Sequence, residues 1–214
     1  MAGELFDAYG RPVVIAASPG VTDLFDASGR PYKVIDNLVA VTNFEDVLQD
    51  LLEADADGVV TNEDLSAALP IEMTLAGQPD VPRNITWAFD AHANITAFSF
   101  TIVGVNGQGT AITDTFTHAD GWSGATAQAY ATVTSVTMTV RTGTGATDTM
   151  DLGFGDIVGL SNPISLATSV YKIKKNAAHM DAAGYTVDET NGTVDLSTGG
   201  AITANDDFTI WYTS

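Results

Sequence analysis

The sequence predicts a mainly β protein: an antiparallel β-sandwich or jelly-roll-like domain, preceded by an extended N-terminal arm and a short helical segment. Apolar and polar residues alternate in three runs between Val81 and Trp122, as they do in strands that bury one face. Further short strand patterns follow, separated by frequent turns, which is typical of an antiparallel sandwich or barrel. Hydrophobic residues make up 45% of the 214 residues, enough for a sizeable core without any Cys.

The three alternating runs predict a three-stranded antiparallel meander. Turn residues at 90–94 and 104–109 separate the runs. Within each run, alternate residues are expected to share one buried face of the sheet. These positions are Ile85, Trp87 and Phe89 in the first run, Phe98, Phe100 and Ile102 in the second, and Ile112 and Phe116 in the third.

The longest strand candidate covers residues 129–140, and its alternation changes phase halfway. Val133 belongs to one phase, whereas Val136 and Met138 belong to the other. A β-bulge near Thr134 and Ser135 restores the register, and so does a strand that bends from one sheet to another.

The first 35 residues contain an internal repeat. The sequence LFDAYGRP at residues 5–12 recurs as LFDASGRP at residues 24–31, and each copy leads into a short apolar run. The Asp-Ala-X-Gly segment favours a tight turn. Two interpretations remain open: a pair of hairpins at the edge of the core, or an arm that lies on a neighbouring subunit. The residues expected to contact that subunit are Leu5, Phe6, Arg11, Leu24, Phe25 and Arg30.

These observations divide the chain into three regions: the arm at residues 1–42, a helical and proline-rich segment at 43–80, and the β-sandwich domain at 81–214. A helix is predicted over 43–54 by apolar residues at helical spacing, and a second over 62–69, before Pro70. Because the linker is rich in proline, the β domain is expected to fold from Gln78 onward by itself.

An acidic stretch between the two predicted helices resembles an EF-hand calcium loop. Glu53, Asp55, Asp57 and Asp64 take the first, third, fifth and twelfth places, and Gly58 takes the sixth. The pattern departs from the family at both ends, since Asp is usual at the first place and a bidentate Glu at the twelfth. The alternative is an acidic turn followed by a capped helix. No cofactor is required, and calcium is the one that this loop suggests.

Charge and missing motifs narrow the function. Only 8 Lys and Arg face 27 Asp and Glu, which disfavours nucleic acid and anionic membranes as partners. The sequence shows no nucleophile elbow, phosphate loop or paired metal-binding His, so we expect a protein that is not an enzyme. Lys172, Lys174 and Lys175 form a basic cluster that either guards an edge strand or contacts an acidic neighbouring copy.

Three stretches carry a resemblance: PRNIT from Pro82, FSFTIVGVNGQGTAITDTFT from Phe98, and AYATVTSVTMTVRTGTGATDTMDLGFGD from Ala129. Together they resemble β-rich structural proteins of tailed bacteriophages, most of all head decoration or cement proteins and related minor virion proteins. The resemblance implies homo-oligomers, with a trimer favoured, bound to the major capsid protein on the capsid surface. Assembly would take place in the host bacterial cytoplasm, without nucleic acid or membrane partners.

A second function stays open beside this one. A tail-associated or surface adhesin would use the β domain to bind carbohydrate, and it would need aromatic side chains exposed in a groove. Trp87, Trp122 and Trp211 are the candidates for this role.

Overall fold

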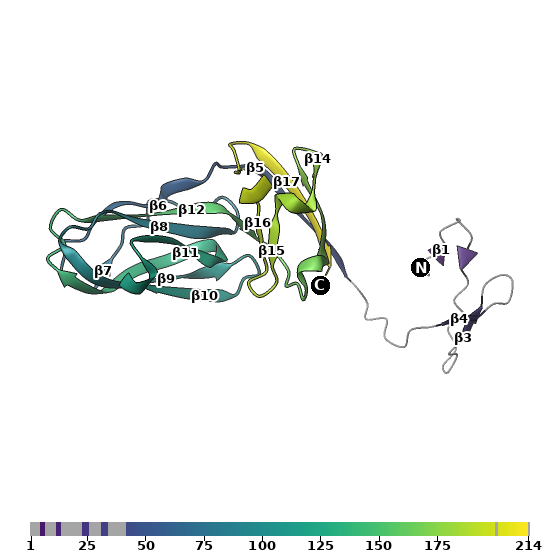
Figure 1. The fold of residues 1–214 in the computed structure, drawn as a ribbon, viewed down its shortest axis with the longest axis horizontal. Coiled ribbons are helices and arrows are strands. Elements are labelled where there is room, and N and C mark those ends of the chain that lie inside the picture. The colour runs from purple at the N-terminus through teal and green to yellow at the C-terminus, as the bar shows by residue number, and fades with distance from the viewer. Residues whose placement is uncertain are drawn as a thin grey trace. The chain divides into compact units, whose positions relative to one another are not determined.

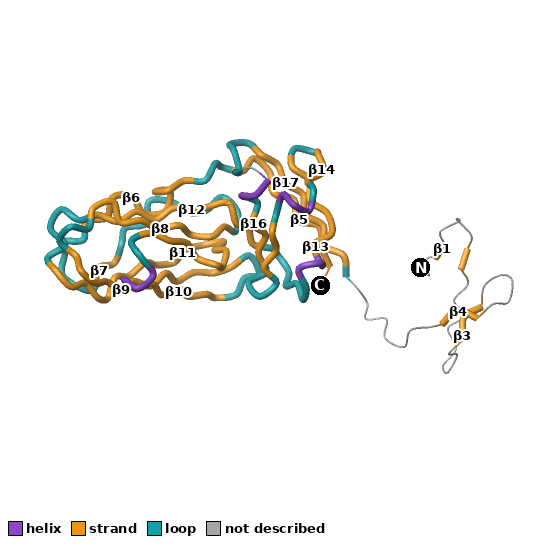
Figure 2. The backbone as a smooth tube through the Cα atoms, in the orientation of Figure 1, coloured by secondary structure: helices purple, strands orange, loops and turns teal. Residues whose placement is uncertain are grey.

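The structure, a computed structural model, describes residues 42–199 and 201–213, together with the backbone of four short strands nearer the N-terminus. The chain divides into two compact units, Met1–Val41 and Thr42–Ser214. The larger unit consists of antiparallel sheets (Figure 1), so the predicted mainly β, sandwich-like fold is confirmed. Helical structure in the described residues is limited to short 3₁₀ turns (Figure 2). These turns are His118–Asp120, Ala167–Ser169, Ala182–Gly184 and Ser197–Gly199.

A two-layered sandwich forms the larger part of this unit. One layer contains the neighbouring strands β6 (Asp55–Asp64), β12 (Thr149–Gly159) and β8 (Arg83–Ala91). The other contains β10 (Ala111–Thr117), β9 (Ile95–Asn106) and β7 (Ile71–Glu72), with β11 (Ser123–Gly143) between β9 and β7 (Figure 1).

The core between these layers is aromatic and centres on Trp87. Its ring lies 6.0 Å from that of Phe98, 5.3 Å from Phe100 and 5.4 Å from Phe116, measured between centroids. Each aromatic pair of this kind adds about 0.5–1.5 kcal/mol to the stabilisation that burial provides. The buried alternation predicted in the three runs is confirmed: Ile85, Trp87, Phe89, Phe98, Phe100, Ile102 and Ile112 are all buried, and Phe116 packs against them.

The predicted meander is wrong in one connection. Strands β9 and β10 pair as a hairpin, and Gly109 takes a φ of 75° in its turn. Strand β8, however, does not pair with β9, because β11 lies between them in the sheet order. Alternation specifies which face a residue uses but not which strand is its neighbour. Here the turn after β8 carries the chain across the core to the opposite layer.

Strand β11 connects the two layers, as its change of phase suggested. It pairs with β8 up to Tyr130 and with β9 from Tyr130 onward. The pairing with β9 shifts register between Val133 and Ser135, which confirms the predicted bulge near Thr134. A bulge bends a strand and strengthens its twist, and both effects help one strand to serve two layers.

A second core lies at the other end of β12. It is covered by a sheet in which β13 (Val170–Lys175) lies between β14 (Ala178–Met180) and β17 (Asp206–Thr213), with β5 (Asn43–Leu51) beyond β17. Two further strands, β15 (Thr186–Asp188) and β16 (Thr193–Asp195), extend from the last residues of β12. The largest fully buried side chains of this core are Leu51, Phe208 and Tyr212.

The helices predicted over 43–54 and 62–69 are wrong, because residues 43–51 form β5, residues 62–64 belong to β6, and residues 65–69 are turn and loop. Leu48 and Leu51 are both buried although they are three positions apart, a spacing that alone favours a helix. The strand achieves it through Asp50, whose φ is 51°, beside a register shift opposite Asp206 and Phe208. Val47, which the helix would have buried, is 56% exposed.

The domain boundary predicted at residue 81 is also wrong. Residues 43–80 are not a linker: β5 pairs with β17, β6 with β12, and β7 with β11. They therefore supply strands to both cores. The boundary that the chain contacts show lies between Val41 and Thr42, close to the predicted end of the arm at residue 42.

The N-terminal repeat is a repeat of structure as well as sequence. Strands β1 (Leu5–Phe6) and β2 (Pro12–Val13) pair, as do β3 (Asp23–Phe25) and β4 (Pro31–Lys33). Leu5 is opposite Val13 and Leu24 is opposite Tyr32, so both hairpins have the same register. Among the proposed contact residues, Leu5, Phe6, Leu24 and Phe25 have a described backbone only, and Arg11 and Arg30 lie outside the described residues.

Candidate functional site

Arg83 lies where the two cores meet, and the sequence analysis did not identify it. Its side chain is fully buried at the start of β8. Nε donates to the carbonyl of Gly155 at 2.6 Å, and Nη1 donates to the carbonyl of Leu52 at 2.7 Å. The guanidinium lies 4.8 Å from the centre of the Phe154 ring. A signal was present, since Arg83 shares its strand phase with the buried Ile85, Trp87 and Phe89.

Two carboxylates balance the charge of Arg83. Nη1 lies 3.3 Å from Asp80, and Nη2 lies 3.7 Å from Asp156. Burial lowers the pKa of Arg83, and both carboxylates act in the opposite direction, so the guanidinium keeps its charge. Nη2 is the one guanidinium nitrogen without a hydrogen-bond partner in the described residues. This group joins the turn after β5, the segment before β8 and the middle of β12.

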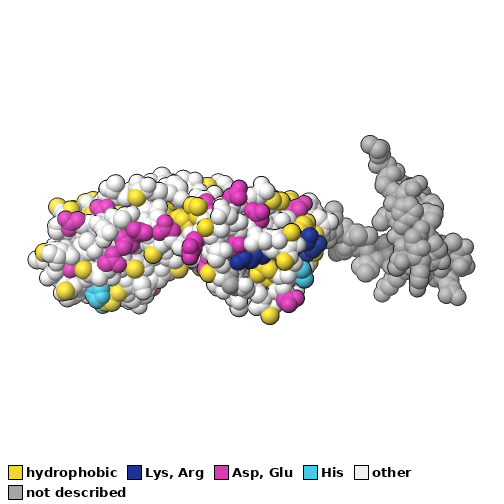
Figure 3. Space-filling view, turned by 90° about the horizontal axis from the view of Figure 1, so that it is seen from above, with side chains coloured by type: hydrophobic (Ala, Val, Ile, Leu, Met, Phe, Trp, Pro, Cys, Tyr) yellow, Lys and Arg dark blue, Asp and Glu magenta, His cyan; other side chains and the backbone are white. Residues whose placement is uncertain are grey.

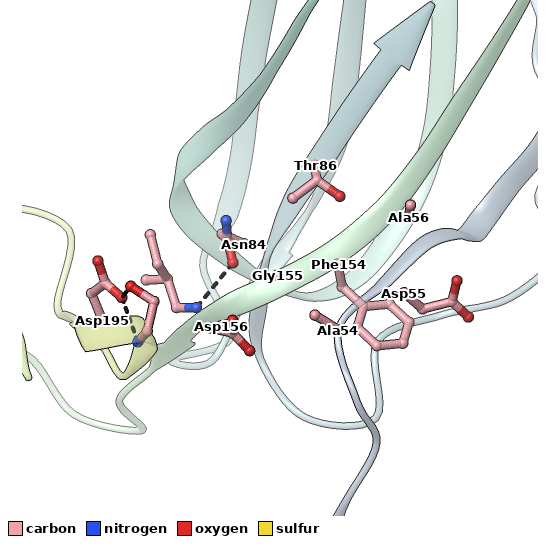
Figure 4. A pocket seen from close by; sticks show the side chains of 11 residues that line it. Ala54, Asp55, Ala56, Asn84, Thr86, Phe154, Gly155, Asp156 and Asp195 are labelled. Carbon is pink, nitrogen blue, oxygen red and sulfur yellow. Dashed lines mark hydrogen bonds between the residues drawn. The ribbon is translucent and has the colours of Figure 1, made fainter. Parts of the chain in front are cut away.

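An open groove of about 490 Å³ lies beside this junction (Figure 4). Phe154, Gly155 and Asp156, which all contact Arg83, also line the groove. The remaining polar lining comes from Asp55, Asn84 and Asp195, together with Thr86 and Ser197. In Figure 4 Asp55 and Asp195 lie at opposite ends, with Asn84 and Phe154 between them.

Most polar groups of the groove hold the backbone in place. Asn84 Oδ1 accepts a hydrogen bond from the amide of Ile157 at 3.1 Å. Asp156 Oδ1 accepts one from the amide of Ile202 at 3.0 Å. Asp195 accepts from both the amide and the hydroxyl of Ser197, at 2.9 and 2.6 Å, which is an Asx-type turn. The groove therefore presents hydrogen-bond acceptors. Among the described residues that line it, Ser197 is the serine, and no histidine lies in the lining.

The predicted EF-hand geometry is wrong, because Asp55–Asp64 is a strand. Asp55 is opposite Phe154 and Asp64 is opposite Thr149, so the two carboxylates lie at opposite ends of the pairing with β12. Calcium needs oxygen ligands at about 2.3–2.6 Å around one point. Among the described residues, no group of three or more His, Cys, Asp or Glu is placed to hold a metal ion. Glu53 precedes the strand and is exposed, and Asp64 instead accepts hydrogen bonds from Ser66.

Four of the acidic residues form a cluster of like charges, Asp55, Asp57, Asp90 and Asp151, which we name the acidic face. Hydrogen bonding to Asp55, with the nearby charges of Asp55 and Asp151, raises the pKa of Asp57. Burial and the neighbouring Asp90 carboxylate raise the pKa of Asp151. The described ion pairs involve Arg83 and Lys175 and none of these four residues. No described Lys or Arg side chain therefore forms an ion pair that would offset the repulsion within the acidic face.

Asp151→Asn is expected to stabilise the protein at neutral pH. The amide keeps an oxygen that accepts from the Asn62 N–H, as Asp151 does, and adds a donor toward Asp90. Because the folded-state pKa of Asp151 is raised, its unfavourable charge develops as pH rises through that value. The gain should therefore be present at pH 7, decline as pH falls through the raised folded-state pKa, and be absent below the ordinary pKa of 3.8.

Thermal unfolding of the parent and of Asp151→Asn between pH 7 and pH 3 checks this expectation. Asp181→Asn is the control, because Asp181 is exposed and follows β14, away from the acidic face. It should shift the midpoint of thermal unfolding far less. A destabilised Asp151→Asn at pH 7 would contradict the repulsion argument.

The basic cluster does not guard an edge, which corrects one of its two interpretations. Strand β13 lies between β14 and β17. Lys175 pairs with Asp206 at 2.8 Å. Lys172 and Lys174 instead approach the half-buried Trp211 on β17, with Nζ 4.5 and 5.7 Å from the ring centre. Cation–π contacts of this kind contribute about 0.5–1 kcal/mol at exposed sites.

The three tryptophans have different surroundings. Trp87 is 2% exposed and belongs to the sandwich core, so it cannot line an open carbohydrate groove. Trp122 is half-buried and stacks on His92 with ring centres 4.0 Å apart. Trp211 lies on the outer face of its sheet, since its neighbours Ile210 and Tyr212 are buried in the second core. Trp122 and Trp211 are thus the two that have surface available.

Comparisons with protein-family models, curated proteins and solved structures found no match to this chain. Among the described residues, no helix is long and apolar enough to cross a membrane.

Proposed function

We propose that this chain is a structural protein of a tailed-bacteriophage virion, a decoration or cement protein that stabilises the capsid through non-catalytic contacts. In this proposal the chain forms homo-oligomers, a trimer by analogy, and binds the major capsid protein on the capsid surface after assembly in the host cytoplasm. One observation carries the proposal: two hairpins of identical register occur in a unit separate from the β body.

The physical argument concerns what such hairpins need. Strands of two or three residues are marginal in water without further partners. Each copy brings a Leu-Phe pair, and burying either side chain contributes about 1.5–3 kcal/mol. A second surface that takes up both pairs would therefore stabilise the hairpins. A lattice of identical subunits offers equivalent docking positions for equivalent hairpins.

The larger unit suits a structural role. It has two hydrophobic cores and no Cys. Its buried Arg83 and the carboxylate of Asp156 form hydrogen bonds with backbone groups, which hold the chain in place. The formal charge of −19 disfavours adhesion to packaged nucleic acid. These features support a rigid module that displays an N-terminal attachment.

A carbohydrate-binding adhesin is the second candidate, and Trp211 is the observation that favours it. A half-exposed indole beside two lysines can stack on a sugar ring and bind an acidic substituent. The adhesin hypothesis predicts that the protein binds a glycan and that Trp211→Ala abolishes this binding. It also predicts that binding does not need the N-terminal hairpins.

Co-sedimentation tests the proposal. Purified protein is mixed with empty shells assembled from the major capsid protein of the same genome, and the pellet is quantified over a range of concentrations. We expect saturable binding at a fixed ratio to the capsid subunit. A protein that remains in the supernatant at every concentration would contradict the proposal.

A further inference from the structure

The outer face of the sheet β14-β13-β17-β5 combines positive charge with an aromatic side chain. Lys172 is opposite Trp211, and Lys174 is opposite Thr209. We name Lys172, Lys174 and Trp211 the lysine face. Val47 extends it on the neighbouring strand β5, opposite Thr209, and is 56% exposed.

Among the Lys and Arg residues that the structure describes between Thr42 and Ser214, Lys172 and Lys174 are the ones left without a carboxylate partner, a hydrogen bond to a backbone carbonyl or a buried position. Arg83 is buried, Arg141 donates to the carbonyls of Leu65 and Ala67, and Lys175 pairs with Asp206. The ion pairs among the described residues include neither Lys172 nor Lys174. On the face that Figure 3 shows, acidic side chains occur along the length of the described surface, whereas basic ones appear only toward its right end.

We propose that the lysine face is a docking surface for a second copy of this chain, which binds it through its acidic face of Asp55, Asp57, Asp90 and Asp151. Charge complementarity supports this occupant. The two lysines lack carboxylate partners within the described body, and the four carboxylates lack a cation, so one contact between copies satisfies both. Trp211 is the type of half-buried anchor on which interface energy concentrates.

The two faces differ, so the contact is head-to-tail. Such an interface closes into a ring or continues as an open array, depending on the rotation between copies. The net repulsion between two chains of charge −19 opposes association at long range. At physiological salt the Debye length is about 8 Å, so the local attraction at the contact outweighs distant charges. This inference concerns Thr42–Ser214 and does not depend on the proposed attachment to a shell.

Sedimentation velocity of the full chain, over a concentration series in physiological salt, measures the association. We expect the parent to self-associate, and Lys172→Gln/Lys174→Gln to weaken the association about tenfold or more. Ala111→Glu/Thr113→Glu on the exposed edge strand β10 changes the net charge by the same amount and is the matched control. It should associate like the parent.

A charge exchange identifies the partner surface. Lys172→Glu/Lys174→Glu and Asp57→Lys/Asp151→Lys should each fail to self-associate, whereas a mixture of the two should associate again. A monomeric parent, an unaffected lysine variant or a mixture that stays monomeric would each overturn the proposal. A monomeric parent that binds an acidic polysaccharide through Trp211 would overturn it as well and assign the lysine face to a glycan.

Discussion

Replacing Arg83 by Met is expected to destabilise the protein by about 3–5 kcal/mol. The variant keeps much of the side-chain volume but leaves Asp80 and Asp156 without their cation and the carbonyls of Leu52 and Gly155 without a donor. Arg83 itself is fully buried, and carboxylates without their cation and carbonyls without a donor are among the costlier defects that a single substitution creates. The effect should also reach both cores, because Arg83 lies where they meet.

Denaturant unfolding followed by tryptophan fluorescence and by circular dichroism measures this effect. We expect one transition in the parent and a lower midpoint in Arg83→Met, with the two probes no longer coincident. Arg141→Met is the matched control, since Arg141 is half-buried and donates to backbone carbonyls but has no ion pair among the described residues. Its cost should be about 0.5–1.5 kcal/mol. An Arg83→Met variant as stable as the control would show that Arg83 does not hold the junction.

A protein that begins at Thr42 is expected to fold, and one that begins at Gln78 is not. The shorter chain lacks β5, β6 and β7, and with them buried side chains of both cores. The lost apolar residues are Leu48, Leu51, Val59, Val60, Leu65, Ile71 and Met73. Their burial contributes on the order of 10–20 kcal/mol. This loss exceeds the roughly 5–15 kcal/mol by which folded domains are stable.

Calorimetry and near-ultraviolet circular dichroism distinguish the two proteins. The Thr42 protein should show one cooperative melt and fixed aromatic signals, and the Gln78 protein should show neither. A cooperative melt of the Gln78 protein would restore the domain boundary that the sequence predicts at residue 81.

Much of the fold could be predicted because it depends on alternation. The parity of Ile85, Trp87 and Phe89 identified the face of β8 that packs against Phe98 and Phe100. The phase change near Thr134 predicted the bulge that lies within the pairing of β11 with β9. Local rules of side-chain direction hold for any strand, whatever its neighbours are.

The errors arose where tertiary contacts override local pattern. Leu48 and Leu51 have helical spacing, yet the positive φ of Asp50 lets a strand bury both. Asp55, Asp57 and Asp64 have the spacing of a calcium loop, yet pairing with β12 draws them out into a strand. A side chain at Gly153 would collide with the carbonyl of Asp55, so this glycine permits the close approach of β6. No such long-range requirement can be read from residues 43–64 alone.

The candidate sites divide in the same way. The lysine cluster and the repeat were found from sequence, because both are local patterns. Arg83 was missed because its partners Leu52, Gly155 and Asp156 are distant in sequence and meet it only in the fold. The acidic face was missed for the same reason, since Asp90 and Asp151 belong to different strands.

Shell binding by the full chain and by Thr42–Ser214 tests the central proposal most directly. Both proteins are sedimented with the empty shells described above, after calorimetry has shown that each is folded. The proposal predicts that the full chain saturates the shells and that the protein without the two hairpins stays in the supernatant. Equal binding of the two proteins would contradict attachment through the repeat.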